Sequence, residues 1–200
     1  MSEDRAPRRA LRTVVIIGST RAGRFGPTVA GWFAGRARRR AELCVDVVDL
    51  AEAGLPDALV EDGDPRPAPV GALATRLAAA DAFVVVTPEY NRSFPAPLKT
   101  AIDWFHEEWR AKPVAIVSYG GESGGLYAAS QLREVFTELH AVAVPGGVGV
   151  ARYWEQFTAD GAWPKPSAPC NTDAAALLDR LTWWAHALRD ARALRPYPAS

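Results

Sequence analysis

Short, nearly continuous apolar runs alternate along the chain with longer stretches whose apolar residues recur every three or four positions. The short runs predict β-strands buried on both faces, and the longer stretches predict amphipathic helices. The predicted strands are 12–18, 43–49, 82–87, 113–119 and 141–144, and the predicted helices are 27–40, 70–80, 96–105, 126–139 and 172–194. This alternation predicts an α/β fold of three layers, in which helices cover both faces of a five-stranded parallel sheet.

The turn after the first predicted strand, residues 18–28, is rich in glycine, hydroxyl-bearing and basic residues. A strand, such a turn and a helix start together aim free backbone N–H groups and the positive helix end at one spot, which favours phosphate binding. Hydroxyl and guanidinium groups would strengthen that site. The candidates are Ser19, Thr20, Arg21, Arg24, Phe25, Gly26 and Thr28. The plain alternative is a strand–helix connection that binds nothing.

The spacing of this turn argues against two common nucleotide sites. A Walker-type loop needs Lys and then Ser or Thr where this chain has Arg24 and Phe25, so a magnesium-dependent NTPase is disfavoured. The glycines at 18, 23 and 26 do not match the dinucleotide fingerprint, which disfavours a dehydrogenase with Asp49 as its ribose ligand. The pattern instead predicts a site for one terminal phosphate, held without a metal.

Two further turns follow predicted strands. Five strands with a phosphate turn after the first suggest the flavodoxin-like order 2-1-3-4-5, which would bring all three turns to one edge of the sheet. The segment Pro88–Asn91 can offer backbone amides beside the Tyr90 ring to a flat heteroaromatic ligand, or it can be a plain turn. The segment 118–125 contains four glycines. Glycines let the backbone approach a ligand closely, and the backbone N–H groups can then stabilise a ring that gains negative charge. The alternative is that this segment is only a flexible connection.

Composition changes this picture little. The chain has 200 residues, 48% of them hydrophobic, and a formal net charge of zero, which predicts one domain over 1–200 without a field that favours nucleic acid or membrane. We expect a flexible tail over 1–11 and a long aromatic-rich loop over 150–171. No apolar segment resembles a signal peptide or a membrane span, so a cytoplasmic protein is expected.

The cysteines, histidines and potential nucleophiles of the chain form no recognisable metal site or catalytic arrangement of side chains. The two cysteines form neither a disulfide framework nor a metal spacing, and Cys44 is expected in the core. The three histidines are scattered on predicted helices, which argues against a metal site; they are His106, His140 and His186. Because neither ligand-like turn holds a Ser-His-Asp or Cys-His arrangement, we expect a cofactor to carry the chemistry.

Three motifs in register resemble those of the NAD(P)H-dependent FMN reductases, a family of flavodoxin-like fold that also contains quinone, azo-dye and chromate reductases. The motifs are GSTR at 18–21, TPEYN at 87–91 followed by PLK at 97–99 and IDW at 102–104, and KPVAIVSYGG at 112–121 followed by the glycines at 124 and 125. The likeness runs from about Thr13 to about Pro145.

The resemblance implies bound FMN. Ser19, Arg21 and the turn up to Thr28 would hold its phosphate, and Pro88–Asn91 would line the isoalloxazine ring. The ring's pyrimidine end would lie at the third turn, whose candidates are Ser118, Tyr119, Gly120, Gly121 and Ser123. NADPH or NADH would reduce the flavin, and a small acceptor such as a flavin or quinone would take the electrons. The resemblance implies no catalytic side chain. The backbone near Gly120 and Gly121 would stabilise the charge of the reduced ring.

The resemblance also implies a homodimer or homotetramer, with Trp104 and Trp109 as interface candidates. After Pro145 the chain departs from the family pattern, because 152–169 is a long loop that carries Tyr153, Trp154, Phe157 and Trp163. This loop could select the second substrate, plug the structure or contact another subunit. Two other functions stay open, a flavodoxin-like electron carrier and a scaffold without a cofactor. The carrier is disfavoured because the chain has no acidic run for docking.

Overall fold

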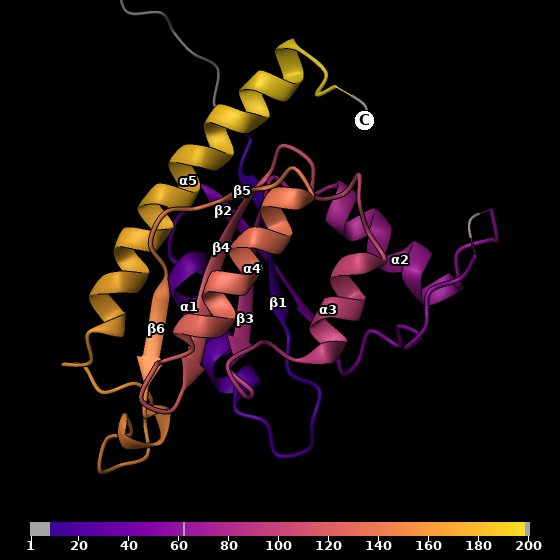
Figure 1. Cartoon of the computed structure of the whole chain (residues 1–200). Coiled ribbons are helices and arrows are strands. Elements are labelled where there is room, and N and C mark those ends of the chain that lie inside the picture. Colours follow the sequence, from indigo (N-terminus) through magenta and orange to yellow (C-terminus); the bar gives the residue numbers. More distant parts are fainter. Residues whose placement is uncertain (1–8, 62, 199–200) are drawn as a thin grey trace, which may run out of the picture.

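A parallel sheet in the order β2-β1-β3-β4-β5 runs through the centre of the molecule (Figure 1). The computed structural model describes residues 9–61 and 63–198. The strands are β1 (Leu11–Ile17), β2 (Leu43–Asp49), β3 (Ala82–Pro88), β4 (Pro113–Gly120), β5 (Val142–Ala143) and β6 (Val148–Ala151). This arrangement confirms the predicted flavodoxin-like fold and its strand order.

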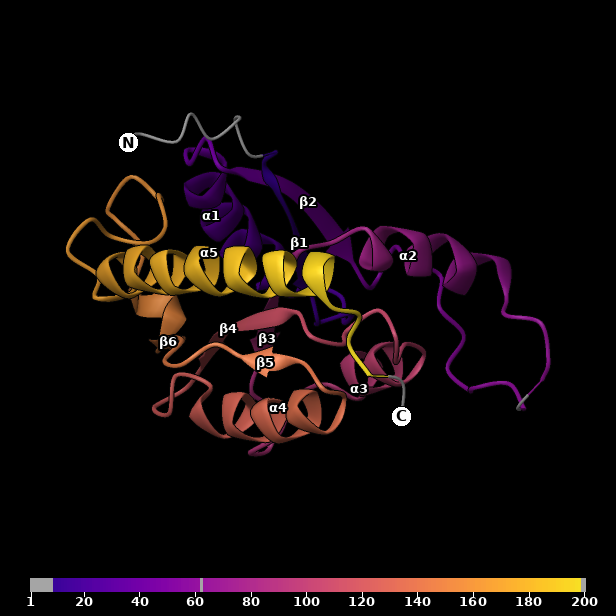
Figure 2. The same ribbon diagram turned by 90° about the horizontal axis from the view of Figure 1, so that it is seen from above.

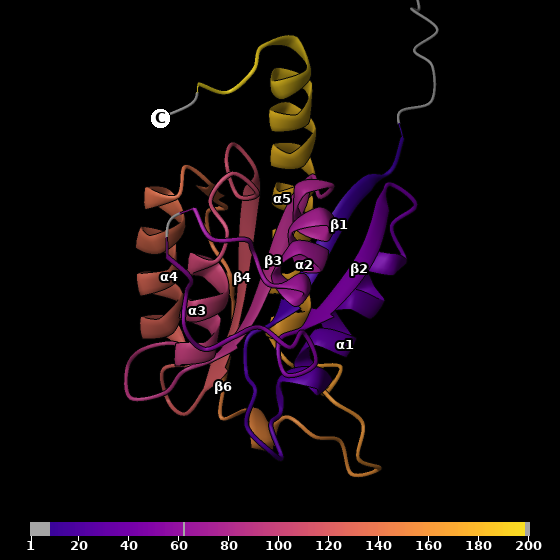
Figure 3. The same cartoon turned by 90° about the vertical axis from the view of Figure 1, so that its right-hand side faces the viewer.

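Helices cover both faces of this sheet. They are α1 (Gly26–Arg38), α2 (Ala68–Ala78), α3 (Ala96–Asp103), α4 (Leu126–Glu138) and α5 (Cys170–Leu194), with a short 3₁₀ helix η1 (Tyr153–Glu155). One core lies between the sheet and α1 with α5, and the other between the sheet and α2, α3 and α4 (Figures 2 and 3). The strands β3 and β4 are buried along their whole length, as their continuous apolar runs predict.

The last position of the sheet differs from the prediction. The sheet has six strands rather than five, because both β5 and β6 pair with β4. Between them, Pro145 has no N–H for the ladder and Gly146 adopts a left-handed φ of +79°, so the chain leaves the sheet and returns. The Arg133 guanidinium donates to the Gly146 carbonyl at 2.6 Å and stabilises this connection between β5 and β6. The predicted strand 141–144 therefore covers only the first of the two pieces.

Three residues lie differently from their predicted places. Cys44 is exposed on β2, which is an edge strand of the sheet. Trp109 is buried against Phe83 at 4.7 Å between ring centroids, and its indole N–H donates to a backbone carbonyl. Trp104 is also buried and donates to the Pro56 carbonyl at 3.1 Å. Both tryptophans belong to the core of their own chain, so the prediction that they form a subunit interface is wrong.

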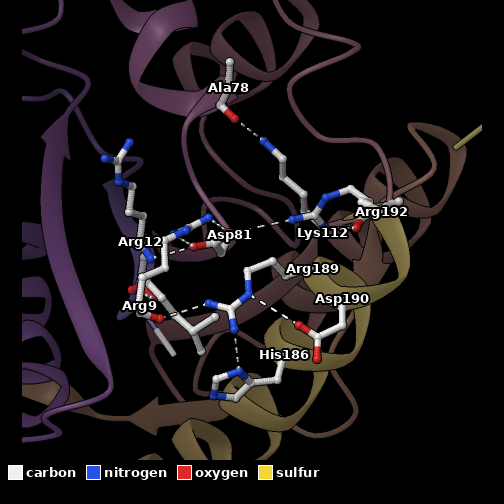
Figure 4. A network of polar contacts seen from close by, with 12 residues as sticks. Arg9, Arg12, Ala78, Asp81, Lys112, His186, Arg189, Asp190 and Arg192 are labelled. Carbon is white, nitrogen blue, oxygen red and sulfur yellow. Dashed lines mark hydrogen bonds and ion pairs between the residues drawn. The ribbon is translucent and has the colours of Figure 1, made fainter. Parts of the chain in front are cut away.

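A polar network ties the amino ends of the strands together (Figure 4). Asp81 is almost fully buried and accepts two hydrogen bonds from the Arg9 guanidinium and one from the Arg12 backbone N–H. Arg192 on α5 lies 3.8 Å from the same carboxylate. Since Arg9 is anchored and Leu11 begins β1, the predicted flexible tail is wrong at residues 9–11, and its remainder, 1–8, lies outside the described residues.

Candidate active site

The three turns after β1, β3 and β4 meet at the carboxyl edge of the sheet, at the lower end of the molecule in Figure 1. They enclose a cavity of about 230 Å³ together with η1. Its lining residues are Arg21, Phe25, Pro88, Glu89, Tyr90, Tyr119, Gly120, Gly121, Tyr153 and Trp154. Eight of these ten residues were predicted as cofactor contacts. A cavity at this edge is the usual ligand position of an open parallel sheet.

The first turn is packed tightly where α1 begins. Ser19 is fully buried, and the Tyr119 hydroxyl donates to its Oγ at 3.4 Å. Burial raises the pKa of Tyr119 to about 12, so this phenol stays neutral in the physiological range. A Cβ at Gly26 would collide with Ser19 Oγ and lie 2.9 Å from Ile17 Cγ2. Glycine is therefore required at this position for the turn to close over the end of β1.

Two arginines of this turn point in different directions. The Arg21 guanidinium lies 5.1 Å from the centroid of the Tyr90 ring, so it links the first turn to the second beside the cavity. Arg24 instead forms an ion pair with Asp49 at the end of β2. Its Nε atom is buried and has no hydrogen-bond partner within the described residues. Asp49 was the expected ribose ligand in the dehydrogenase alternative. In the structure it is instead the counter-ion of Arg24 in the first turn.

The second turn is held in a fixed shape by its own backbone and by Glu89. Asn91 adopts a left-handed φ of +49°, as its residue type predicts, and Tyr90 and Ser93 exchange two backbone hydrogen bonds. The Glu89 carboxylate accepts from Ser123 Oγ at 2.8 Å and from the Tyr127 backbone N–H at 2.9 Å. Both Glu89 oxygens therefore brace the second turn against the third turn and the start of α4.

The third turn presents backbone rather than side chains to the cavity. Ser118 is buried and donates to the Gly124 carbonyl at 3.0 Å, which closes the turn from behind. A Cβ at Gly120 would lie 3.3 Å from the Gly125 nitrogen, whereas a Cβ at Gly121 would meet nothing within 4 Å. Gly121 therefore leaves its peptide surface open toward the cavity.

Several predicted contacts lie outside the cavity. Ser118 and Ser123 border a separate hollow of about 280 Å³ behind the third turn. Thr20 borders a hollow of about 230 Å³ near α3, and Thr28 faces the outer side of α1. The exposed Asn91 shapes its turn without lining the cavity. Each of these residues belongs to one of the predicted turns, but none of them lines the cavity.

The aromatic loop supplies walls that the motifs did not identify. Tyr153 stacks on Phe25 with 4.6 Å between ring centroids, and it also contacts the edge of Tyr119. The Arg152 backbone N–H donates to the Gly121 carbonyl at 3.0 Å, which ties this loop to the third turn. The density of aromatic residues after Arg152 was the sequence signal for a role near the site.

No metal chemistry or membrane span is indicated within the described residues. No group of three or more His, Cys, Asp or Glu side chains there could hold a metal ion. The histidines lie apart, with His106 after α3, His140 after α4 and His186 within α5. No helix in the described part of the chain is long and apolar enough to cross a membrane.

Most of the chain matches a known protein family. The family model described as NADPH-dependent FMN reductase matches residues 11–155. The chain belongs to this family. An NAD(P)H-dependent FMN reductase of Schizosaccharomyces pombe is 39% identical over 136 residues, which span 62% of this chain and 64% of that protein. A quinone reductase of Escherichia coli is 37% identical over 139 residues, which span 67% of this chain and 73% of that protein.

A solved structure shows the same flavodoxin-like architecture. The flavoenzyme NAD(P)H:(acceptor) oxidoreductase FerB from Paracoccus denitrificans superposes with a TM-score of 0.75 at 23% identity, over 89% of this chain and 98% of that chain. At this identity the likeness concerns the fold alone. The family match ends at residue 155, so most of the aromatic loop and all of α5 lie beyond it.

Proposed function

We propose that this FMN reductase family member is an FMN-dependent NAD(P)H oxidoreductase, which passes electrons from a nicotinamide nucleotide to a small acceptor such as a flavin or a quinone. The cavity of about 230 Å³ carries this proposal, because it lies between a phosphate-type turn and an open glycine backbone. The names of the curated relatives support the same reaction class. Bound FMN supplies a ring that accepts a hydride and then releases electrons.

The first turn fits the phosphate of FMN. The buried Arg24 Nε has no partner within the described residues, which leaves a donor available for an anion. Arg21 adds a second cation at the cavity, and Ser19 adds a hydroxyl beside the start of α1. We assign the phosphate to these three side chains and to the backbone N–H groups of the turn. Thr20 and Thr28 point away from the cavity and are left out of this assignment.

The second and third turns fit the flavin ring. Pro88 and Tyr90 offer one wall, and the peptide surface of Gly120 and Gly121 offers the other. Backbone N–H groups there can stabilise negative charge that develops on a bound ring, without a titratable side chain. Glu89 and Ser118 are positioning residues, since their polar atoms hold the two turns rather than face the cavity.

The remaining parts of the proposal concern organisation. We propose that residues 1–200 act as a single flavodoxin-like domain and that the protein forms a homodimer or homotetramer. Because Trp104 and Trp109 are buried in their own chain, other residues must supply the subunit contact. The cytoplasmic location stays a prediction.

Flavin binding and flavin reduction test the proposal separately. The purified protein should bind FMN, and riboflavin should bind much more weakly because it lacks the phosphate; titration calorimetry measures both. Stopped-flow absorbance should then show bleaching of the flavin band by NADPH or NADH, followed by reoxidation with a quinone. Equal affinity for FMN and riboflavin would refute the phosphate assignment. FMN binding without reduction by either nucleotide would instead identify an electron carrier.

A further inference from the structure

We propose that a groove between α1 and the aromatic loop binds the adenosine 2′-phosphate end of NADPH, and that it makes NADPH the preferred donor over NADH. This inference rests on the proposed function and extends it to the identity of the donor. The groove has a volume of about 710 Å³ and lies on the outer side of α1, beside the flavin-site cavity.

The floor and walls of the groove suit a flat aromatic group. Gly31 and Gly35 form the floor on α1, and a Cβ built at either one would meet nothing within 4 Å. Trp32 and Trp163 line the groove with indole rings that meet edge to face at 5.5 Å and 82°. Both indoles are only partly buried, and the Arg36 guanidinium lies over the Trp32 ring at 5.4 Å from its centroid. The exposed indole surface that Arg36 does not cover is the surface against which an adenine would pack.

The charge of the groove suits an anion. Arg36 and Arg39 line it, and none of the described lining residues is a carboxylate. Arg36 donates to Asn171, but its Nε is buried and has no hydrogen-bond partner within the described part of the chain. The Arg39 side chain has no hydrogen bond or ion pair with any described residue. A phosphate monoester would give these donors the charged acceptor that they lack.

The groove is separated from the flavin-site cavity by one layer of aromatic rings. Phe25 lines the cavity and contacts Trp163, which lines the groove, with 5.1 Å between ring centroids. The Trp163 indole N–H donates to the Tyr153 carbonyl at 3.0 Å, which fixes this ring relative to the cavity wall. A donor whose nicotinamide lies in the cavity could therefore place its adenosine end in the groove.

This position distinguishes the two donors by chemistry. NADPH carries a 2′-phosphate on its adenosine, and NADH has a hydroxyl there, so only NADPH can use both arginines fully. Trp163 belongs to the segment beyond residue 155, where the family match ends. The site is therefore built partly from residues outside the family's matched region.

Titration calorimetry with adenosine 2′,5′-bisphosphate tests the groove without depending on flavin. The bisphosphate should bind the wild-type protein and compete with NADPH, and AMP should bind about tenfold more weakly. Arg39→Gln should weaken bisphosphate binding by roughly fivefold to tenfold and leave AMP binding unchanged. Arg38→Gln is the matched control, since Arg38 is exposed on the same helix but does not line the groove.

Steady-state kinetics with the FMN-loaded enzyme provide the second measurement. In Arg39→Gln the KM for NADPH should rise by a similar factor, while kcat and the KM for NADH stay constant. Equal effects of the Arg38 and Arg39 substitutions, or equal binding of bisphosphate and AMP to the wild type, would overturn the groove assignment even where FMN is bound and reduced. A wild-type protein that binds no FMN would overturn the proposed function itself, and the donor assignment with it.

Discussion

The buried amine of Lys112 should make the free energy of unfolding rise with pH in the alkaline range. Its Nζ donates to the Leu77 carbonyl at 2.9 Å, near the end of α2. It also donates to the Ala78 carbonyl at 2.9 Å, as Figure 4 shows. Burial is the main cause of a lowered pKa, and repulsion from Arg192 adds to it, while Asp81 opposes it. Together these effects lower the pKa of Lys112 from 10.5 to about 8.

The size and sign of the effect follow from proton linkage. A pKa lowered from 10.5 to about 8 corresponds to about 3 kcal/mol, since each pH unit is worth about 1.36 kcal/mol. Between these two pH values the unfolded chain keeps a proton on Lys112 that the folded chain has released. The unfolded state then binds more protons, so stability rises with pH in this range. The cost of burying the charged amine is fully present below pH 8 and is relieved by pH 10.5.

Urea unfolding of the wild type and Lys112→Met at pH 7.5 to 10, at matched flavin content, measures this effect. The stability of the wild type relative to the variant should increase with pH by up to about 3 kcal/mol, because the variant lacks the titrating group. Lys99→Met is the control: Lys99 is half exposed and paired with Asp103, so its variant should show no comparable slope. A difference between wild type and Lys112→Met that is independent of pH over this range would refute the reasoning.

Three further predictions concern the flavin site. Gly121→Val should fold normally but bind FMN poorly, because its side chain enters open space at the cavity, whereas Gly120→Val should also lower the melting temperature, since its Cβ would press on the Gly125 backbone at 3.3 Å. Arg21→Ala should weaken FMN binding by roughly tenfold to a hundredfold, from the loss of about 1.5–3 kcal/mol, and leave riboflavin binding unchanged in calorimetry. Glu89→Ala should cost about 1–3 kcal/mol in urea unfolding, since it removes two hydrogen bonds between turns; unaltered stability would contradict the bracing role.

The layered fold, and the edge of the sheet at which the site lies, can be predicted from the amino-acid sequence. Continuous apolar runs identify β3 and β4 as strands buried on both faces, since only such strands lack a polar face. In a parallel sheet every strand ends at the same edge, so the turns after β1, β3 and β4 had to meet there. Local backbone chemistry was predictable as well, as the left-handed Asn91 shows.

The directions of individual side chains, and the partners they meet, depend on the tertiary structure. Glu89 belongs to the second turn but bonds to Ser123 of the third turn and to the Tyr127 backbone at the start of α4, which become its neighbours only after folding. Ser118 instead donates to the Gly124 carbonyl within its own turn, so its hydroxyl is used to close that turn. The contact between Trp32 and Trp163 joins segments that no local pattern relates. Periodicity fixes which face of an element is apolar, but the packing partner across that face depends on contacts between residues distant in the chain.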